Sequence, residues 1–256
     1  MPTFESFDGA TLSYQDEGRG RAVLLLHGFA ADTNINWIRS GVLDALVDEG
    51  YRVLALDARG HGLSAKPHDP AAYENDAMAH DPRALLDHLD VERAHVVGYS
   101  MGAGTALTLA ATEPRVRRVV AVGVGGATLA RRQSGDADGA AEEGLGSDMV
   151  DGLLADDPET ITDPLARRFR TLADSVRADR QALAAYARAR RAQGVVDYGS
   201  ITVPVLVVAG ADDELAGDPA ELAARIPGAT AATVPGDHFT SLQHPKLARA
   251  VLEFLA

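Results

Sequence analysis

The chain has 256 residues, of which 46% are hydrophobic, and this is enough material for the core of one large globular domain. Its formal net charge of −13 argues against a nucleic-acid partner, which needs clustered lysine and arginine. The absence of cysteine excludes disulfides, thiolate chemistry and cysteine-ligated zinc. No secretory signal is recognisable, and the longest apolar stretch, residues 119–130, is too short to span a bilayer. A cytoplasmic protein without a membrane partner is therefore expected.

Short apolar runs alternate with helical patterns along most of the chain. This alternation predicts an α/β fold with a mostly parallel sheet and helices on both of its faces. Strands are expected at residues 3–7, 11–15, 22–26, 51–56, 94–99, 116–124, 203–209 and 230–234. Helices are expected at residues 36–47, 75–89, 101–112, 219–225 and 245–255, with Pro82 causing a kink or a late start in the second.

Residues 127–200 interrupt this alternation and carry helical patterns only. We therefore expect a core made of residues 1–126 and 201–256, with residues 127–200 inserted as a helical cap. The insertion is acidic in its first half and rich in arginine in its second. Such charge runs commonly mark solvated helix faces of opposite sign, and the functional alternative is a cap that tunes ligand entry.

The strongest chemical signal is the pentapeptide Gly98-Tyr99-Ser100-Met101-Gly102, which fits G-x-S-x-G. It lies between an expected strand and an expected helix, which is the context that gives this motif its meaning. Small residues two positions before and after the serine allow a sharp turn, and the helix start behind it favours developing negative charge. Ser100 is therefore predicted to be a nucleophile.

A serine nucleophile needs backbone donors aimed at the oxyanion of its tetrahedral intermediate. The N–H of Met101, directly after the nucleophile, supplies one. The second is expected from the loop after strand 22–26, where the N–H of Phe29 is the natural candidate. His27 in the same loop is interpreted as a structural histidine that braces it.

The general base is predicted to be His238, because it follows the last expected strand and so lies at the carboxyl edge of the sheet. His244 belongs instead to the start of the closing helix. The acid that orients the imidazole is expected after strand 203–209, where Asp212, Asp213 and Glu214 share one loop. The residues themselves leave the choice among these carboxylates open.

Taken together, these motifs resemble those of the α/β-hydrolase superfamily, and the resemblance covers nearly the whole chain outside the expected cap. Residues 57–64 (D-A-R-G-H-G-L-S) are similar to the family's D-x-R-G-x-G-x-S turn, and residues 236–239 read G-D-H-F. The sequence also shows G-x-x-D at residues 210–213, and the resemblance implies that Asp213 is the triad acid. It further implies an eight-stranded sheet and a purely structural turn at residues 57–64.

The resemblance also narrows the chemistry. Haloalkane dehalogenases and epoxide hydrolases of this fold carry aspartate at the elbow, which Ser100 argues against. The pentapeptide is similar to those of small esterases, enol-lactonases, the cofactor-free haloperoxidase or perhydrolase group, and carbon–carbon bond hydrolases.

We therefore expect a hydrolase that cleaves a small carboxylic ester through an acyl-enzyme, with no cofactor and no metal. Trp37, Phe239 and Leu242 are candidates for the pocket lining, although each is equally compatible with a place in the core. The alternatives within the class are an enol-lactonase, a carbon–carbon hydrolase and a perhydrolase. The alternative outside it is a ligand receptor that keeps the triad with little turnover.

Overall fold

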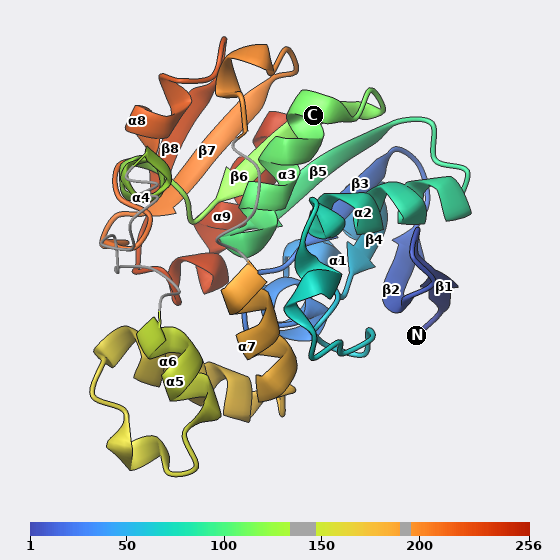
Figure 1. Cartoon of the computed structure of the whole chain (residues 1–256). Coiled ribbons are helices and arrows are strands. Elements are labelled where there is room, and N and C mark those ends of the chain that lie inside the picture. The colour runs from blue at the N-terminus through green and yellow to red at the C-terminus, as the bar shows by residue number, and fades with distance from the viewer. Residues whose placement is uncertain (134–146, 190–195) are drawn as a thin grey trace.

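The computed structural model describes residues 1–133, 147–189 and 196–256. Within these ranges eight strands form one sheet in the order β1-β2-β4-β3-β5-β6-β7-β8 (Figure 1). The strands are β1 Thr3–Glu5, β2 Thr11–Gly18, β3 Ala22–Leu26, β4 Arg52–Leu56, β5 Ala94–Tyr99, β6 Val116–Val122, β7 Val205–Gly210 and β8 Thr230–Val234. Strand β2 runs antiparallel to β1 and β4, and the other pairs are parallel, so the predicted fold class is confirmed.

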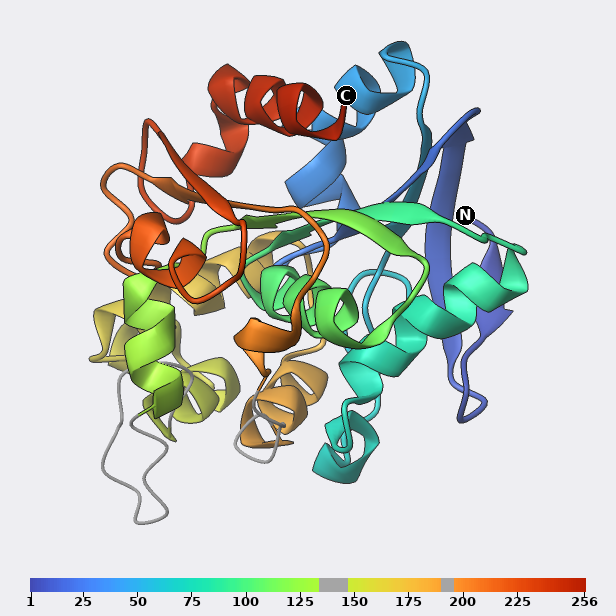
Figure 2. The ribbon, with the colours of Figure 1, turned by 90° about the horizontal axis from the view of Figure 1, so that it is seen from above.

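Continuous apolar strands form the centre of this sheet because both of its faces are covered. The covering helices are α1 Val42–Asp48, α2 Ala77–His88, α3 Met101–Thr112, α8 Pro219–Ala223 and α9 Pro245–Leu255. In β3, Val23 and Leu25 pack beneath α1 and α9, whereas Leu24 and Leu26 pack beneath α2, α3 and α8. Figure 2 shows these two helical layers on opposite sides of the sheet.

Two expected helices differ in detail. The single helix predicted at residues 36–47 is divided into a π-helical turn, Asn34–Ile38, and α1, because Gly41 between them has φ 75°. Helix α2 starts at Ala77, two residues later than predicted, and holds Pro82 in its second turn. No helix in the described ranges is long and apolar enough to cross a membrane.

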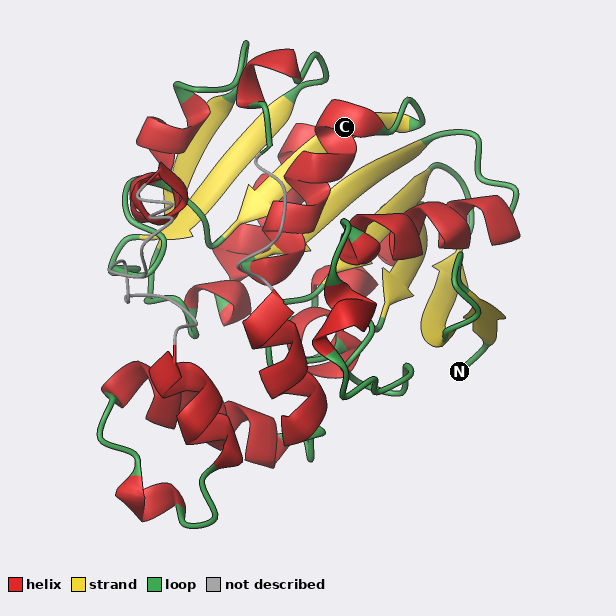
Figure 3. Ribbon diagram, viewed as in Figure 1, coloured by secondary structure: helices red, strands yellow, loops and turns green. Residues whose placement is uncertain are grey.

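Helices α5 Ser147–Leu154, α6 Pro164–Ser175 and α7 Arg180–Ala189 lie below the carboxyl ends of the strands (Figures 1 and 3). They pack on one another around an apolar cluster that also contains Phe29 from the core. Helix α4, Gly126–Gln133, contacts α8 instead, although it falls inside the expected insertion. Residues 134–146 and 190–195 of that insertion are outside the described ranges.

The strand order reverses at β3, since β4 pairs with one side of it and β5 with the other. Such a reversal opens a crevice at the carboxyl edge of a parallel sheet. The loops after β3 and β5 carry Phe29 and Ser100, and they therefore leave the sheet side by side at this point.

Candidate active site

Ser100 occupies the turn between β5 and α3 with φ 52° and ψ −106°, a backbone conformation that non-glycine residues rarely adopt. Its N–H donates to the carbonyl oxygen of Val122 at 2.7 Å, which ties the turn to β6. A Cβ atom at Gly102 would lie 2.1 Å from the carbonyl oxygen of Leu26, and one at Gly98 would meet helix α3. Both glycines of the motif are thus required by the close approach of strand and helix.

His238 joins the serine to the carboxylate, as the sequence predicts. Its Nε2 lies 3.0 Å from Ser100 Oγ, and its Nδ1 lies 2.9 and 3.1 Å from the two carboxylate oxygens of Asp213. His238 and Asp213 are buried, and the Ala216 N–H donates to Asp213 Oδ1 at 2.8 Å. Asp212 is exposed, and its side chain forms no hydrogen bond or ion pair with any described residue. The structure therefore brings Ser100, His238 and Asp213 together and leaves Asp212 outside.

The loop that carries His238 is held by Asp237. Its Oδ1 accepts the N–H groups of Phe239 at 3.1 Å and Thr240 at 3.0 Å, together with the Thr240 hydroxyl at 2.7 Å. Its Oδ2 accepts from the guanidinium of Arg168 on α6 at 2.7 Å. Hydrogen bonds from Thr240 and Arg168 hold the pKa of the Asp237 carboxyl well below its usual range. Asp237 is thus an ionised brace directly beside the histidine.

Tyr99 is a contributor for which sequence reasoning found no role. Its ring stacks on the His238 imidazole with centroids 5.4 Å apart, and its hydroxyl donates to the His238 carbonyl oxygen. Gly123 leaves room for this pair, because a Cβ there would lie 3.0 Å from the tyrosine ring and 3.2 Å from the imidazole. The sequence signal that could have indicated this role is the position of Tyr99 as the last residue of β5, on the same face of the sheet as Val97.

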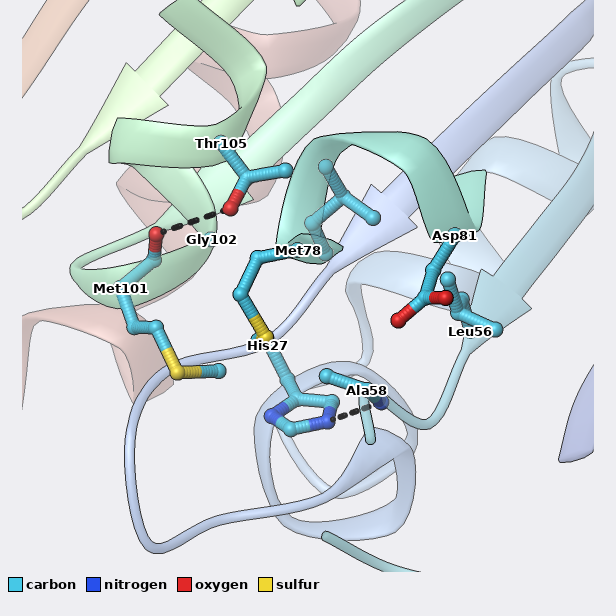
Figure 4. Close-up of a pocket in the computed structure, with 9 residues that line it drawn as sticks. His27, Leu56, Ala58, Met78, Asp81, Met101, Gly102 and Thr105 are labelled. Atoms are coloured by element: carbon cyan, nitrogen blue, oxygen red, sulfur yellow. Dashed lines mark hydrogen bonds between the residues drawn. The ribbon is translucent and has the colours of Figure 1, made fainter. Parts of the chain in front are cut away.

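The two expected oxyanion donors stand on adjacent loops. Among the described residues, the N–H groups of Phe29 and Met101 have no hydrogen-bond acceptor. His27 braces the first of these loops, because its Nε2 accepts the N–H of Ala58 at 3.0 Å while its Nδ1 lies 2.8 Å from the Gly28 carbonyl oxygen. Figure 4 shows this imidazole beside Ala58 in a small pocket behind Met101. The structural interpretation of His27 is thus confirmed.

The loop at residues 57–64 has the structural role that the resemblance implies. The carboxylate of Asp57 accepts the N–H of Thr33 at 3.0 Å and that of Leu63 at 2.9 Å. Arg59 is buried and forms ion pairs with Asp81 at 2.6 Å and Asp8 at 2.8 Å. This network fixes the loop against α2 and the first hairpin.

His61 from the same loop lies between the loop that carries Phe29 and helix α7. It packs on the rings of His27, Phe29 and Tyr186 at 5.1 to 6.2 Å between centroids. Burial lowers the pKa of His61 to about 3, so its imidazole is neutral at physiological pH.

Aromatic rings from four segments pack together beside the site. Phe169 of α6 contacts Phe29 at 5.6 Å and Phe239 at 5.4 Å, and Tyr186 of α7 stacks on Phe29 at 5.5 Å. Of the predicted pocket residues, only Phe239 belongs to this cluster. Trp37 and Leu242 are buried in the core cluster beneath α1 and α9, which corresponds to their alternative interpretation as core residues.

No group of three or more histidine, aspartate or glutamate side chains in the described ranges is arranged to hold a metal ion.

Comparisons with known proteins agree with this fold. A family model described as alpha/beta hydrolase fold matches residues 21–141, which include both loops that carry Phe29 and Ser100. The chain is similar to a hydrolase from Pseudomonas aeruginosa, with 29% identity and a TM-score of 0.74 over 100% of this chain and 98% of that one. It is also similar to an enol-lactonase from Burkholderia xenovorans, with 26% identity and a TM-score of 0.73 over 99% of both chains.

Among curated proteins, a non-heme chloroperoxidase from Kitasatospora aureofaciens is 39% identical over 104 residues, or 41% of this chain and 36% of that protein. The chain spans 35–36% of the length of such curated relatives.

Proposed function

The chain belongs to the α/β-hydrolase superfamily, and from this premise we propose that it is a serine hydrolase that cleaves a small carboxylic ester. The observation that carries the proposal is the position of His238, which reaches Ser100 Oγ at 3.0 Å and the Asp213 carboxylate at 2.9 Å. A nucleophile, a base and an orienting acid in hydrogen-bond reach of one another form the arrangement that activates a serine hydroxyl.

In the proposed reaction, His238 Nε2 takes the proton of Ser100 as Oγ attacks the ester carbonyl carbon. The imidazolium then gives this proton to the departing alcohol oxygen, and the ester C–O bond breaks to leave an acyl-enzyme. Water repeats the sequence, with His238 again taking the proton, and releases the carboxylic acid. Asp213 holds Nδ1–H and stabilises the transient cation.

The N–H groups of Phe29 and Met101 are the proposed oxyanion donors. Support comes from their lack of an acceptor within the described residues and from the loops that hold them. Met101 starts α3, so its N–H is one of the unsatisfied donors of a helix N-terminus. Removing one such donor typically costs about 3 kcal/mol of transition-state stabilisation.

We propose that α5, α6 and α7 form the cap over this site and that their rings select the substrate. Support comes from Phe169 and Tyr186, whose apolar rings contact Phe29 in the loop of the proposed oxyanion donor. A small apolar acyl group fits such a surface better than a charged one, because burying an unpaired charge there is costly. Helix α4 packs on α8 and is assigned to the core.

The second candidate is an enol-lactonase. The similarity to the Burkholderia xenovorans enol-lactonase over 99% of both chains favours it, and hydrolysis of a cyclic ester uses the same residues in the same roles. The two candidates differ only in whether the alcohol formed stays attached to the acid.

The test is a series of p-nitrophenyl esters of increasing acyl length, measured beside Ser100→Ala and a fluorophosphonate label. We expect turnover and labelling in the wild type and neither in Ser100→Ala. His238→Gln should behave like Ser100→Ala, whereas His244→Gln, which changes a half-buried histidine at the start of α9, should leave both signals intact. Three further assays test the alternative activities. Hydrolysis of enol-lactones tests for an enol-lactonase, cleavage of carbon–carbon bond substrates tests for a carbon–carbon hydrolase, and peracid formation from acetate and hydrogen peroxide tests for a perhydrolase. Tight ligand binding without turnover would favour a receptor, and failure of Ser100 to take the label would reject the nucleophile.

A further inference from the structure

A second pocket lies at the amino-terminal edge of the sheet, the edge opposite the candidate active site. It has a volume of about 450 Å³, which is in the range of small-molecule sites. Its walls carry four arginines, Arg21, Arg52, Arg93 and Arg117, together with His95. This concentration of positive charge is unusual in a chain whose formal net charge is −13.

The arginines converge because of the sheet register. Arg21 directly precedes β3, Arg52 is the first residue of β4, Arg93 directly precedes β5 and Arg117 is the second residue of β6. These four strands are neighbours in the sheet, and parallel strands bring their amino ends to the same edge. Figure 1 shows this edge on the side of the sheet away from α5, α6 and α7.

Most of this charge is not neutralised. Arg52 forms an ion pair with Asp16 at 2.7 Å, and Arg21 donates to the Tyr51 hydroxyl at 3.3 Å. Arg93 and Arg117 are exposed, and neither forms an ion pair or side-chain hydrogen bond with any described residue. No carboxylate lines the pocket. Several guanidinium groups are therefore available to a ligand from solvent.

His95 lines the same pocket. The residue is 7% exposed, and its Nδ1 is buried without a hydrogen-bond partner among the described residues. Because protein atoms cover Nδ1, the ring nitrogen left accessible to a ligand is Nε2. Burial lowers the pKa of His95 to about 4, and the charges of Arg21 and Arg118 act in the same direction.

We propose that this amino-edge pocket binds a small polyanion of the phosphate-ester or pyrophosphate class. Guanidinium groups bind phosphate oxygens in a bidentate manner, and several of them around one volume favour a ligand with more than one negative charge. The neutral imidazole of His95 adds one N–H donor to this set. The site is independent of the proposed ester hydrolysis, since it shares no residue with the candidate triad.

The test is calorimetric titration of the full chain with inorganic pyrophosphate at low ionic strength, because salt screens these charges. The variant is the double substitution Arg93→Gln and Arg117→Gln, which removes two exposed arginines without breaking any described contact. The matched control is Arg188→Gln, an exposed arginine on α7 at the other edge of the sheet. Citrate, a polyanion without phosphate, is titrated as the comparison ligand.

We expect pyrophosphate to bind the wild type and the control equally and the double variant at least about 10-fold more weakly. Binding should also raise the pKa of His95, because the anion offsets the charge of Arg21. NMR signals of the His95 imidazole, recorded as a function of pH, measure this change. Absence of binding to the wild type, or equal affinity in the double variant, would overturn the proposal. Citrate binding as tight as that of pyrophosphate would overturn the assignment to phosphate.

Discussion

Tyr99 and His238 form a stacked pair in which the tyrosine hydroxyl donates to the carbonyl oxygen of the histidine itself. Burial raises the pKa of the Tyr99 hydroxyl, so it remains a protonated donor at neutral pH. The residue before the proposed nucleophile thus holds the ring and the backbone of the proposed base. We regard Tyr99 as a positioning residue.

Replacing Tyr99 with phenylalanine should keep the stacking and remove the hydrogen bond. We expect kcat for p-nitrophenyl acetate to fall about 10-fold with KM little changed, and the free energy of unfolding to fall by about 1 kcal/mol. Tyr51→Phe is the matched control, because its hydroxyl also takes part in a hydrogen bond but lies at the opposite edge of the sheet. A loss of stability with unchanged kcat would reduce Tyr99 to a core residue.

Asp213→Asn should lower kcat by about 10³ to 10⁴-fold, because an amide neither stabilises the imidazolium nor selects its productive tautomer. The fold should persist, since the amide oxygen still accepts the Ala216 N–H. Asp212→Asn serves as the comparison and should keep wild-type activity because this carboxylate is exposed and outside the group. Equal losses in both variants would refute the choice of Asp213. Steady-state kinetics with circular dichroism as a folding check decides the matter.

Arg168→Gln should loosen the connection between α6 and the histidine loop. Arg168 binds Asp237 at 2.7 Å and lies 4.0 Å over the ring of Phe239, so one side chain joins the proposed cap to the site. We expect kcat/KM for long acyl esters to rise about 3 to 5-fold relative to short ones, a change of about 1 kcal/mol, which suits an exposed ion pair. High salt should move the wild type in the same direction.

The control for this prediction is Arg188→Gln, which removes a charge from α7 without touching the loop. An acyl-length profile that is identical in wild type, Arg168→Gln and the control would show that the contact does not govern access.

Two of the buried histidines, His61 and His95, should make the protein lose stability in mild acid. Their pKa values are lowered from 6.5 to about 3 and about 4, so the unfolded chain binds protons that the folded one does not. Their contribution to the free energy of unfolding is full above about pH 6.5. Below this pH the free energy of unfolding falls by up to ~1.4 kcal/mol per pH unit for each histidine. Urea unfolding between about pH 7 and pH 5 measures this slope.

In His61→Gln and in His95→Gln the slope should decrease by the share of one titrating group. A slope that is the same in both variants as in the wild type would show that neither histidine is protonated differently in the two states.

Local sequence patterns were sufficient for the strands. β3, for example, was predicted to the residue, because five consecutive apolar residues between polar turns require a position buried on both faces. The division of the first helix was missed because hydrophobic periodicity continues through Gly41, whose positive φ depends on how the chain folds onto the sheet. Helix α2 begins at Ala77 and holds Pro82 in its interior, so the helix does not start at the proline.

The sequence by itself located Ser100 and His238 and limited the acid to the loop of residues 212–214, because each of these segments follows an apolar strand. The choice of Asp213 within that loop came from the family resemblance. The sequence did not determine the role of Tyr99 or the contact of Arg168 with Asp237, since these join segments 139 and 69 residues apart. The four arginines at the amino edge likewise come together only because β4, β3, β5 and β6 are neighbours in an order that differs from their order along the chain. Local propensity acts over a few residues, whereas the order of strands in a sheet is decided by the burial of both faces at once, so these relationships exist only in the tertiary structure.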